Sequence, residues 1–198
     1  MAWAEGETTR RRYHVGNLRA ELLQHAQAIL EAGGLAGLNL RSLAARAGIA
    51  PGSVYHHYAN KAALLAGLAV EGFRALEGEL ERVVREAPHG ARFRTFGRVY
   101  LGFARSRPSL YALMFDPEMM GDPEVTAARD RAFAVLEELV GLALPPAESR
   151  APCEMRKVAL SVWACGHGAV TMEPPQADAD DHRVEDVIRG LELLFQRR

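Results

Sequence analysis

The chain has 198 residues, of which 48% are hydrophobic and 25% charged, and its formal net charge is −1. This length suits one compact unit or a small domain joined to a larger one, and the apolar fraction is ordinary for a chain that buries a core. No apolar run reaches about 18 residues and none opens the chain, so the sequence predicts neither membrane insertion nor secretion, and we expect a cytoplasmic protein.

Helical periodicity dominates the whole chain, and almost nothing alternates with a period of two. We therefore expect an all-α fold of about nine helices. The first runs from about Tyr13 to Ala32, with one apolar face, and ends at Gly33-Gly34. The next two flank a turn at Gly48. The others are expected at about 61–85, 92–106, 108–115, 124–142, 152–172 and 181–195. The apolar stripes predicted for the first and fourth helices are Leu18, Leu22, Ala26 and Ile29, and Leu65, Ala69, Phe73, Leu76, Leu80 and Val84.

Charge is distributed unevenly along the chain. Residues 1–66 carry seven Arg or Lys and four Glu, whereas the rest carries seventeen basic and twenty-one acidic residues. A basic first third and an acidic remainder indicate two different tasks. Two cysteines, Cys153 and Cys165, lie on one predicted helix about 18 Å apart, too far to pair within one chain.

Residues 40–58 have the pattern of a helix-turn-helix. Asn39 stands where a helix N-cap is expected, Gly48 suits a tight turn, and Pro51 suits the first turn of a second helix. Val54 and Tyr58, four residues apart, should face the core. The polar residues between them should then face outward, where they could reach base edges and phosphates of DNA.

The stretch "AARAGIAPGSVYHHYANKAALL", with Arg41 before it and a long helix after it, resembles the TetR family of transcriptional regulators. The resemblance covers about residues 15–66. It implies phosphate contacts for Tyr55, His57 and Lys61, and base contacts for Arg41, Gly52, Ser53 and His56. The chain departs from the family pattern at Ala50, where many members have Ser, so the second helix lacks a side-chain cap.

Other readings of these residues stay open. Arg46 suits a solvated surface better than a base contact. The adjacent pair His56-His57 points about 100° apart on a helix, which disfavours a shared metal ion. The basic segment "RRR" at 10–12 is either a solubilising tail or an arm that follows DNA.

A second resemblance lies in the acidic part. "RPSLYALMF" and "VWACGHGAV" resemble a C-terminal regulatory domain of some TetR regulators, named for its Trp, His and Gly. It implies a helical bundle that binds a small, usually apolar effector, and a homodimer joined through helices 152–172 and 181–195. Gly166 and Gly168 weaken the first of these helices, which indicates a close approach of another helix or of a ligand.

The candidate effector pocket consists of bulky apolar side chains with one polar contact, although residues of this kind are more often core than ligand contacts. They are Phe96, Tyr100, Phe103, Tyr111, Met114, Phe115, Met119, Phe133, Trp163 and His167. None of these side chains carries an isolated charge, so an apolar or amphiphilic effector is favoured.

Enzymatic function finds little support. The only Glu-x-x-His segment, Glu86 to His89, contains a proline and has no second copy. No P-loop, dinucleotide fingerprint or nucleophile elbow occurs. The acidic run 177–186 could hold a cation but better fits a helix start. An architectural DNA protein would need a more basic body.

We therefore expect that the protein is not an enzyme and holds no metal or cofactor. We expect a ligand-responsive regulator, most simply a repressor, that binds a palindromic DNA operator as a homodimer. Its expected parts are an arm at 1–12, a helix-turn-helix domain at 13–60 and a ligand-binding and dimerisation domain at 61–198.

Overall fold

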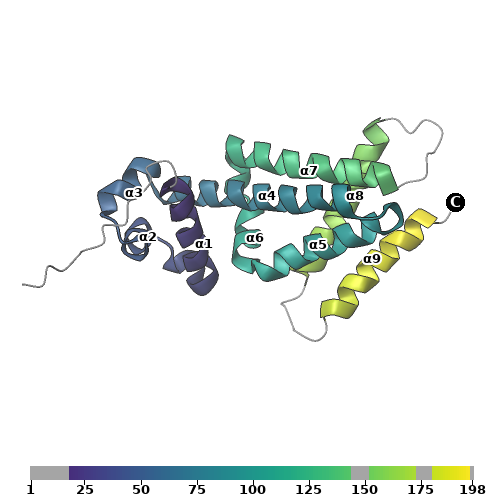
Figure 1. The fold of residues 1–198 in the computed structure, drawn as a ribbon, viewed down its shortest axis with the longest axis horizontal. Coiled ribbons are helices and arrows are strands. Elements are labelled where there is room, and N and C mark those ends of the chain that lie inside the picture. The colour runs from purple at the N-terminus through teal and green to yellow at the C-terminus, as the bar shows by residue number, and fades with distance from the viewer. Residues whose placement is uncertain (1–17, 144–151, 173–179, 197–198) are drawn as a thin grey trace, which may run out of the picture. The chain divides into compact units, whose positions relative to one another are not determined.

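A computed structural model of the protein describes residues 18–143, 152–172 and 180–196. Nearly all of this part of the chain is helical and none of it forms a strand, which confirms the all-α prediction (Figure 1). The chain divides into two compact units, Met1–Lys61 and Ala62–Arg198. The arm at 1–12 and the first turn of the predicted opening helix lie outside the described residues. None of the described helices is long and apolar enough to cross a bilayer.

Unit 1 contains α1 (Leu18–Gly37), α2 (Leu40–Ala47) and α3 (Pro51–His57). The first helix was expected to stop at Gly33-Gly34, and it does break at Gly34, where φ is 63°, but one further turn follows. Its buried residues are Leu22, Ala26 and Leu30. The predicted stripe is confirmed at Leu22 and Ala26, whereas Leu18 and Ile29 are half-buried and Leu30, four residues after Ala26, completes the buried face.

Caps define both ends of α2, and the second of them forms the turn to α3. Asn39 Oδ1 accepts hydrogen bonds from the backbone of Arg41 and Ser42 at 3.0 and 2.8 Å, and Ser42 Oγ accepts one from Asn39 N at 3.1 Å. This reciprocal capping box fixes the start of α2. Gly48 ends α2 in the left-handed region at φ 67°, a conformation that glycine adopts without strain.

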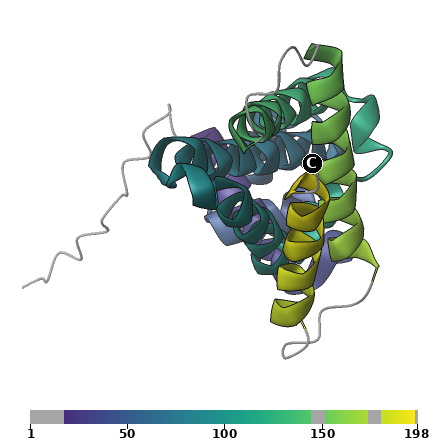
Figure 2. The ribbon, with the colours of Figure 1, turned by 90° about the vertical axis from the view of Figure 1, so that its right-hand side faces the viewer.

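Unit 2 is a helical bundle of α4 (Lys61–Glu86), α5 (Arg92–Ser106), α6 (Pro108–Met114), α7 (Pro123–Ala143), α8 (Pro152–Thr171) and α9 (Asp180–Gln196). Single 3₁₀ turns occur at His89–Ala91 and Met119–Gly121. Figure 2 shows α8 and α9 side by side along one flank of this bundle. The predicted helix limits agree with these to within about two residues in unit 2.

The buried stripe of α4 differs from the prediction at both ends. Leu64 and Val83 are buried where Leu65 and Val84 were expected, and Gly72 lies at the centre of the stripe. A Cβ on Gly72 would be 2.6 Å from Sδ of Met114 on α6. The buried stripe of α4 therefore has a glycine at its centre. A pattern of apolar side chains at helical spacing does not include glycine, so it does not predict this position.

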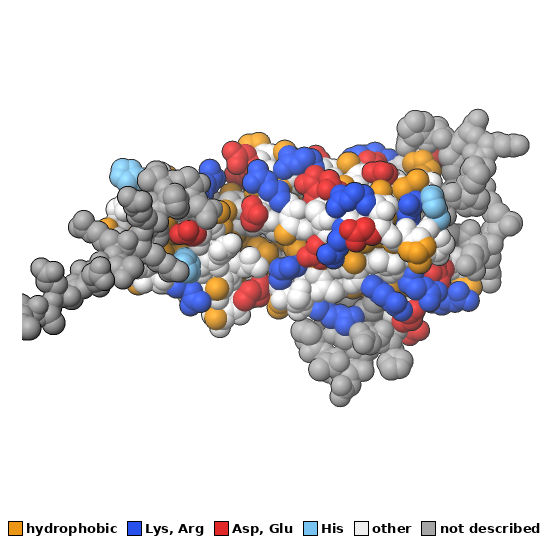
Figure 3. All heavy atoms as spheres, in the orientation of Figure 1, with side chains coloured by type: hydrophobic (Ala, Val, Ile, Leu, Met, Phe, Trp, Pro, Cys, Tyr) orange, Lys and Arg blue, Asp and Glu red, His pale blue; other side chains and the backbone are white. Residues whose placement is uncertain are grey.

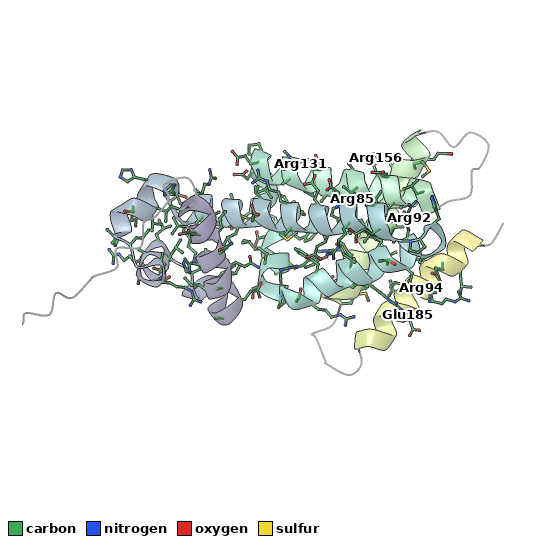
Figure 4. The ribbon with its side chains drawn as sticks, viewed as in Figure 1. Arg85, Arg92, Arg94, Arg131, Arg156 and Glu185 are labelled. Carbon is green, nitrogen blue, oxygen red and sulfur yellow. The ribbon has the colours of Figure 1, made fainter. Side chains whose placement is uncertain are left out.

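Helix α9 is held to α5 by packing and by ion pairs. Ile188 of α9 is buried against Gly97 of α5, where a Cβ would come within 2.6 Å of Ile188 Cγ1. Beside this contact Arg94 binds both carboxylate oxygens of Glu192, at 3.2 and 2.7 Å, and bonds Glu185 at 3.2 Å. Figure 4 shows Arg94 and Glu185 facing each other between the two helices.

Candidate functional site

In unit 1 the exposed side of α3 carries the predicted contact residues. Val54 and Tyr58 are 0% and 1% exposed, which confirms them as core residues. Holding them inward leaves Gly52, Tyr55 and His56 exposed, with Tyr55 at 50%, and Ser53 and His57 half-buried. Pro51 begins the helix, and Ala50 provides no side-chain cap, as expected. Short hydrogen-bonding groups therefore line the exposed face of a helix whose opposite face is buried at Val54.

Two cationic residues accompany α3. Arg41 is exposed in the first turn of α2. Lys61 is exposed as well, and its Nζ donates a hydrogen bond to the backbone carbonyl of Leu35 at 2.7 Å. An ammonium group has three donors, so this bond leaves two for another acceptor. The Leu35 contact was missed by sequence reasoning, because the two residues are 26 positions apart.

The charge of this segment favours an anionic partner. From Leu38 to Lys61 the sequence contains Arg41, Arg46 and Lys61 and no Asp or Glu. Such a segment attracts phosphate groups without local repulsion. By contrast, basic and acidic side chains are interspersed over the face of unit 2 that Figure 3 shows.

The interior of unit 2 contains a cluster of aromatic rings. Phe115 is at its centre, with ring centroids 4.8 Å from Tyr111, 4.5 Å from His167 and 6.2 Å from Trp163. It also makes an edge contact with Phe73 of α4 at 5.4 Å. Phe115 therefore joins α4 to α6 and α8.

Three polar side chains form a hydrogen-bonded chain inside this cluster. The Tyr100 and Tyr111 hydroxyls are 2.7 Å apart, and the Tyr111 hydroxyl is 2.8 Å from His167 Nδ1. Burial raises the pKa of both tyrosines above their ordinary value and lowers the pKa of His167. A lowered pKa favours the uncharged imidazole of His167, whose Nδ1 can accept a hydrogen bond from the Tyr111 hydroxyl.

Gly166 packs next to the hydrogen-bonded side chains of Tyr100, Tyr111 and His167. A Cβ at Gly166 would be 3.1 Å from the Tyr100 ring, so the glycine lets Tyr100 approach α8 closely. This agrees with the close approach expected there. Gly168, for which the same was expected, faces open space in the described structure.

A surface cleft of about 330 Å³ lies between α7 and α8. Its lining residues are Phe115, Arg129, Asp130, Phe133, Arg156, Leu160 and Trp163. Of the candidate pocket residues, Phe115, Phe133 and Trp163 line it. The remaining candidates do not: Phe96, Tyr100, Phe103, Tyr111, Met114 and Met119 are buried and His167 is half-buried.

The sequence analysis missed the polar part of this cleft. Arg129, Asp130 and Arg156 are charged residues on helices, a pattern that by itself indicates only a solvated face. Arg156 holds its guanidinium 5.0 Å from the centre of the Phe133 ring and bonds Glu137 at 3.2 Å. Within the described residues, no three His, Cys, Asp or Glu side chains come together as a metal site would need.

The outer face of α8 is unusually apolar for an exposed surface. Leu160, Ala164, Gly168 and Met172 follow one another at intervals of four residues, with Leu160 and Met172 exposed by 61% and 82%. On α9, Gly190 and Leu193 are also exposed. The side chains of Val184, Leu194 and Phe195, apolar residues of the same helix, lie outside the described residues.

Comparisons with known proteins match two family models to different parts of the chain. The model of "Bacterial regulatory proteins, tetR family" matches residues 22–68, and that of "Tetracyclin repressor-like, C-terminal domain" matches residues 93–188. The nucleoid occlusion factor SlmA of Marinomonas sp. (strain MWYL1) is 27% identical over 146 residues, which are 68% of this chain and 74% of that protein.

Solved structures share the fold over most of the chain. A Rhodococcus sp. RHA1 protein of unknown function is 28% identical, with a TM-score of 0.75 and coverage of 94% of this chain and 100% of that chain. The TetR-family regulator PfmR from Thermus thermophilus is 16% identical, with a TM-score of 0.62 and coverage of 88% and 97%.

Proposed function

The chain belongs to the TetR family of bacterial regulators, and from this premise we propose that it is a repressor that leaves its DNA operator when a small apolar or amphiphilic effector binds. Members of the family are DNA-binding transcription factors without enzymatic activity, which act as dimers on operators and respond to small molecules. The observation that carries the proposal is the exposed face of α3, which lies within a segment, 38–61, that has three basic residues and no acidic ones.

On DNA, the exposed face of α3 lies in the major groove. Arg41, Gly52, Ser53 and His56 approach base edges, where an Arg fork suits guanine O6 and N7. Tyr55, His57 and Lys61 contact phosphates and set the register of α3 on the duplex. The two donors of Lys61 that Leu35 leaves unused serve the phosphate.

Two copies of the chain pair through α8 and α9. The exposed residues Ala164, Gly190 and Leu193, which lie outside the cleft, support this arrangement, because small and apolar residues let two helices approach closely. The two α3 helices of such a dimer enter successive major grooves about 34–36 Å apart, which requires a palindromic operator.

The effector occupies the cleft between α7 and α8 and acts through α4. Phe115 lines the cleft and contacts Phe73 of α4, the helix that begins at the last residue of unit 1. A ligand that binds one arrangement of α4 better than another shifts the balance between them, and a coupling of about 1–3 kcal/mol weakens operator binding roughly 5- to 150-fold.

The test is selection of bound fragments from the source genome at about 150 mM salt, with the intact protein and with Tyr55→Ala. Salt at this level suppresses purely electrostatic binding, so sequence-specific fragments dominate what is recovered. We expect a palindromic site that the intact protein enriches and the variant loses. Equal, unselective recovery by both proteins would contradict the proposal.

A further inference from the structure

The cleft between α7 and α8 has an aromatic floor, made of three rings that are tilted against one another by 42° and 74°. The Phe133 and Trp163 rings are 5.1 Å apart, and Phe115 is 6.2 Å from Trp163. A volume of about 330 Å³ is at the low end for small-molecule sites. An aromatic or compact apolar group fits such a floor, where rings pack by offset stacking or edge contacts.

The two guanidinium groups of the cleft are not equally occupied. Arg129 directs both Nε and Nη2 to a single oxygen of Asp130, at 3.1 and 2.8 Å, and its Nη1 to the sulfur of Met120. The Nε–Nη2 edge of Arg129, the edge that binds a carboxylate through two hydrogen bonds, is therefore already occupied by Asp130. This Arg129–Asp130 pair adds no net charge to the cleft.

Arg156 is different, because only one of its nitrogens is used. Its Nη1 bonds Glu137 at 3.2 and 3.5 Å, whereas Nε and Nη2 have no partner among the described residues. Nε and Nη2 form the edge of the guanidinium that can donate two parallel hydrogen bonds to one carboxylate. The group lies 5.0 Å from the Phe133 ring centre, so this charge is held at the border of the aromatic floor.

We propose that the effector of this protein is an aromatic or compact apolar carboxylate, whose body packs on Phe115, Phe133 and Trp163 and whose carboxylate binds the free edge of Arg156. This inference rests on the assignment of the cleft as the effector site in the proposed function. It narrows the effector class, because a neutral apolar compound leaves the Nε and Nη2 donors of Arg156 unused and an ammonium compound offers these donors no acceptor.

Glu137 allows a test in which two substitutions should change the affinity for a carboxylate in opposite directions. This carboxylate already pairs with Arg156 and competes with an incoming anion for the same charge. Removing Arg156 therefore weakens carboxylate binding, whereas removing the charge of Glu137 strengthens it. A purely structural role for the Arg156–Glu137 pair would make both variants bind more weakly.

The experiment is isothermal titration calorimetry of the full chain, without DNA, against three probes of one shape: 2-naphthoate, 2-naphthamide and 2-naphthylmethylammonium. The variants are Arg156→Gln, Glu137→Gln and Lys157→Gln. Lys157 is the exposed neighbour of Arg156 on α8 and lies outside the lining, so its variant removes the same charge without touching the cleft. Circular dichroism confirms that each variant is folded.

We expect 2-naphthoate to bind at least tenfold more tightly than 2-naphthamide, and 2-naphthylmethylammonium to bind more weakly than both. Arg156→Gln should remove this preference, Glu137→Gln should strengthen carboxylate binding about threefold, and Lys157→Gln should change it less than twofold. Equal affinity for the acid and the amide, or weaker binding in Glu137→Gln, would overturn the proposal.

A separate readout distinguishes this inference from the proposed function. Operator affinity is measured with and without 2-naphthoate at saturation. Carboxylate binding through Arg156 with no change in operator affinity would support the ligand class and contradict the effector role. Operator release by 2-naphthamide but not by 2-naphthoate would keep the effector role and overturn the ligand class.

Discussion

At the scale of single residues, Lys61 combines an observed structural contact with a proposed contact to DNA. Its ammonium group caps the backbone carbonyl of Leu35, next to the break in α1 at Gly34, and in the proposed complex it also contacts a phosphate. A lysine acts on phosphate as a point charge and does not distinguish bases. Its loss should therefore affect every DNA sequence in the same way.

Lys61→Ala should weaken binding to operator and unrelated DNA by similar factors and reduce the slope of log K against log salt by about one. The measurement is a salt titration of both affinities by fluorescence anisotropy. Lys61→Arg, which keeps the charge, is the control. A change in sequence preference in Lys61→Ala would instead assign a base contact to this residue.

His167 makes stability depend on pH. Burial lowers its pKa below the ordinary value of about 6.5, so the unfolded chain binds this proton more readily than the folded chain. The folded state keeps its full stability above about pH 6.5 and loses some as the pH falls from there through the lowered pKa. Protonation also removes the acceptor at Nδ1 for the Tyr111 hydroxyl.

The free energy of unfolding should therefore decrease between pH 7 and pH 5 more steeply in the wild type than in His167→Gln. Urea unfolding at several pH values measures both slopes, and the difference between them removes the contribution of the other histidines. Parallel slopes would show that His167 has the same pKa in the folded and unfolded chain.

Residues within one motif were predictable and residues joined across the fold were not. The spacing of Val54 and Tyr58, the cap at Asn39 and the turn at Gly48 follow from local rules, and the structure confirms each of them. The bond from Lys61 to Leu35 and the cleft position of Arg156 depend on how distant segments meet. A single sequence contains no local signal for such contacts.

At the scale of helices, close crossings depend on glycines that helix propensity disfavours. Gly97 on α5 admits Ile188 of α9, and Gly72 on α4 admits Met114 of α6. In α5, Gly102 is also helical but has no atom near its Cβ position. The two glycines of α5 should therefore respond in opposite ways to the same substitution.

Gly97→Ala should lower the free energy of unfolding by about 1–3 kcal/mol, because the new methyl group displaces Ile188 and strains the contact between α5 and α9. Gly102→Ala should raise it by up to about 1 kcal/mol through helix propensity alone. Urea unfolding measures both. If Gly97→Ala were as stable as Gly102→Ala, the crossing would be able to relax at no cost.

The spacing of apolar residues and helix breakers also explains which parts of the bundle could be predicted from the sequence. Apolar periodicity and breakers such as Pro108 and Pro123 located the helices of unit 2 to within about two residues. The same pattern misplaced the ends of the α4 stripe, since apolar residues stand at both 64 and 65 and at both 83 and 84, and only tertiary packing chooses between them.

At the scale of the whole molecule, the account requires that events in the cleft reach α4. Phe115 is the residue that lines the cleft and contacts the Phe73 ring, at 5.4 Å and nearly at right angles. If the two rings transmit the ligand's effect together, their contributions to the coupling should not be additive.

Phe115→Leu and Phe73→Leu should each reduce the ratio of operator dissociation constants with and without saturating 2-naphthoate, and the double variant should lose little more than either single one. Anisotropy titrations of the four proteins give the coupling for a double-mutant cycle. Additive losses would mean that the two rings act independently, and unchanged ratios that coupling bypasses them.

The most direct test of the central claim compares one pair of affinities. On the site recovered from the genome, the dissociation constant is measured at about 150 mM salt for the palindrome and for a scrambled duplex of equal composition. A sequence-reading dimer should prefer the palindrome by at least about 10³-fold, and Tyr55→Ala should lose much of that preference. Equal affinity for both duplexes, falling together as salt rises, would show that this protein binds DNA by charge alone and does not read an operator.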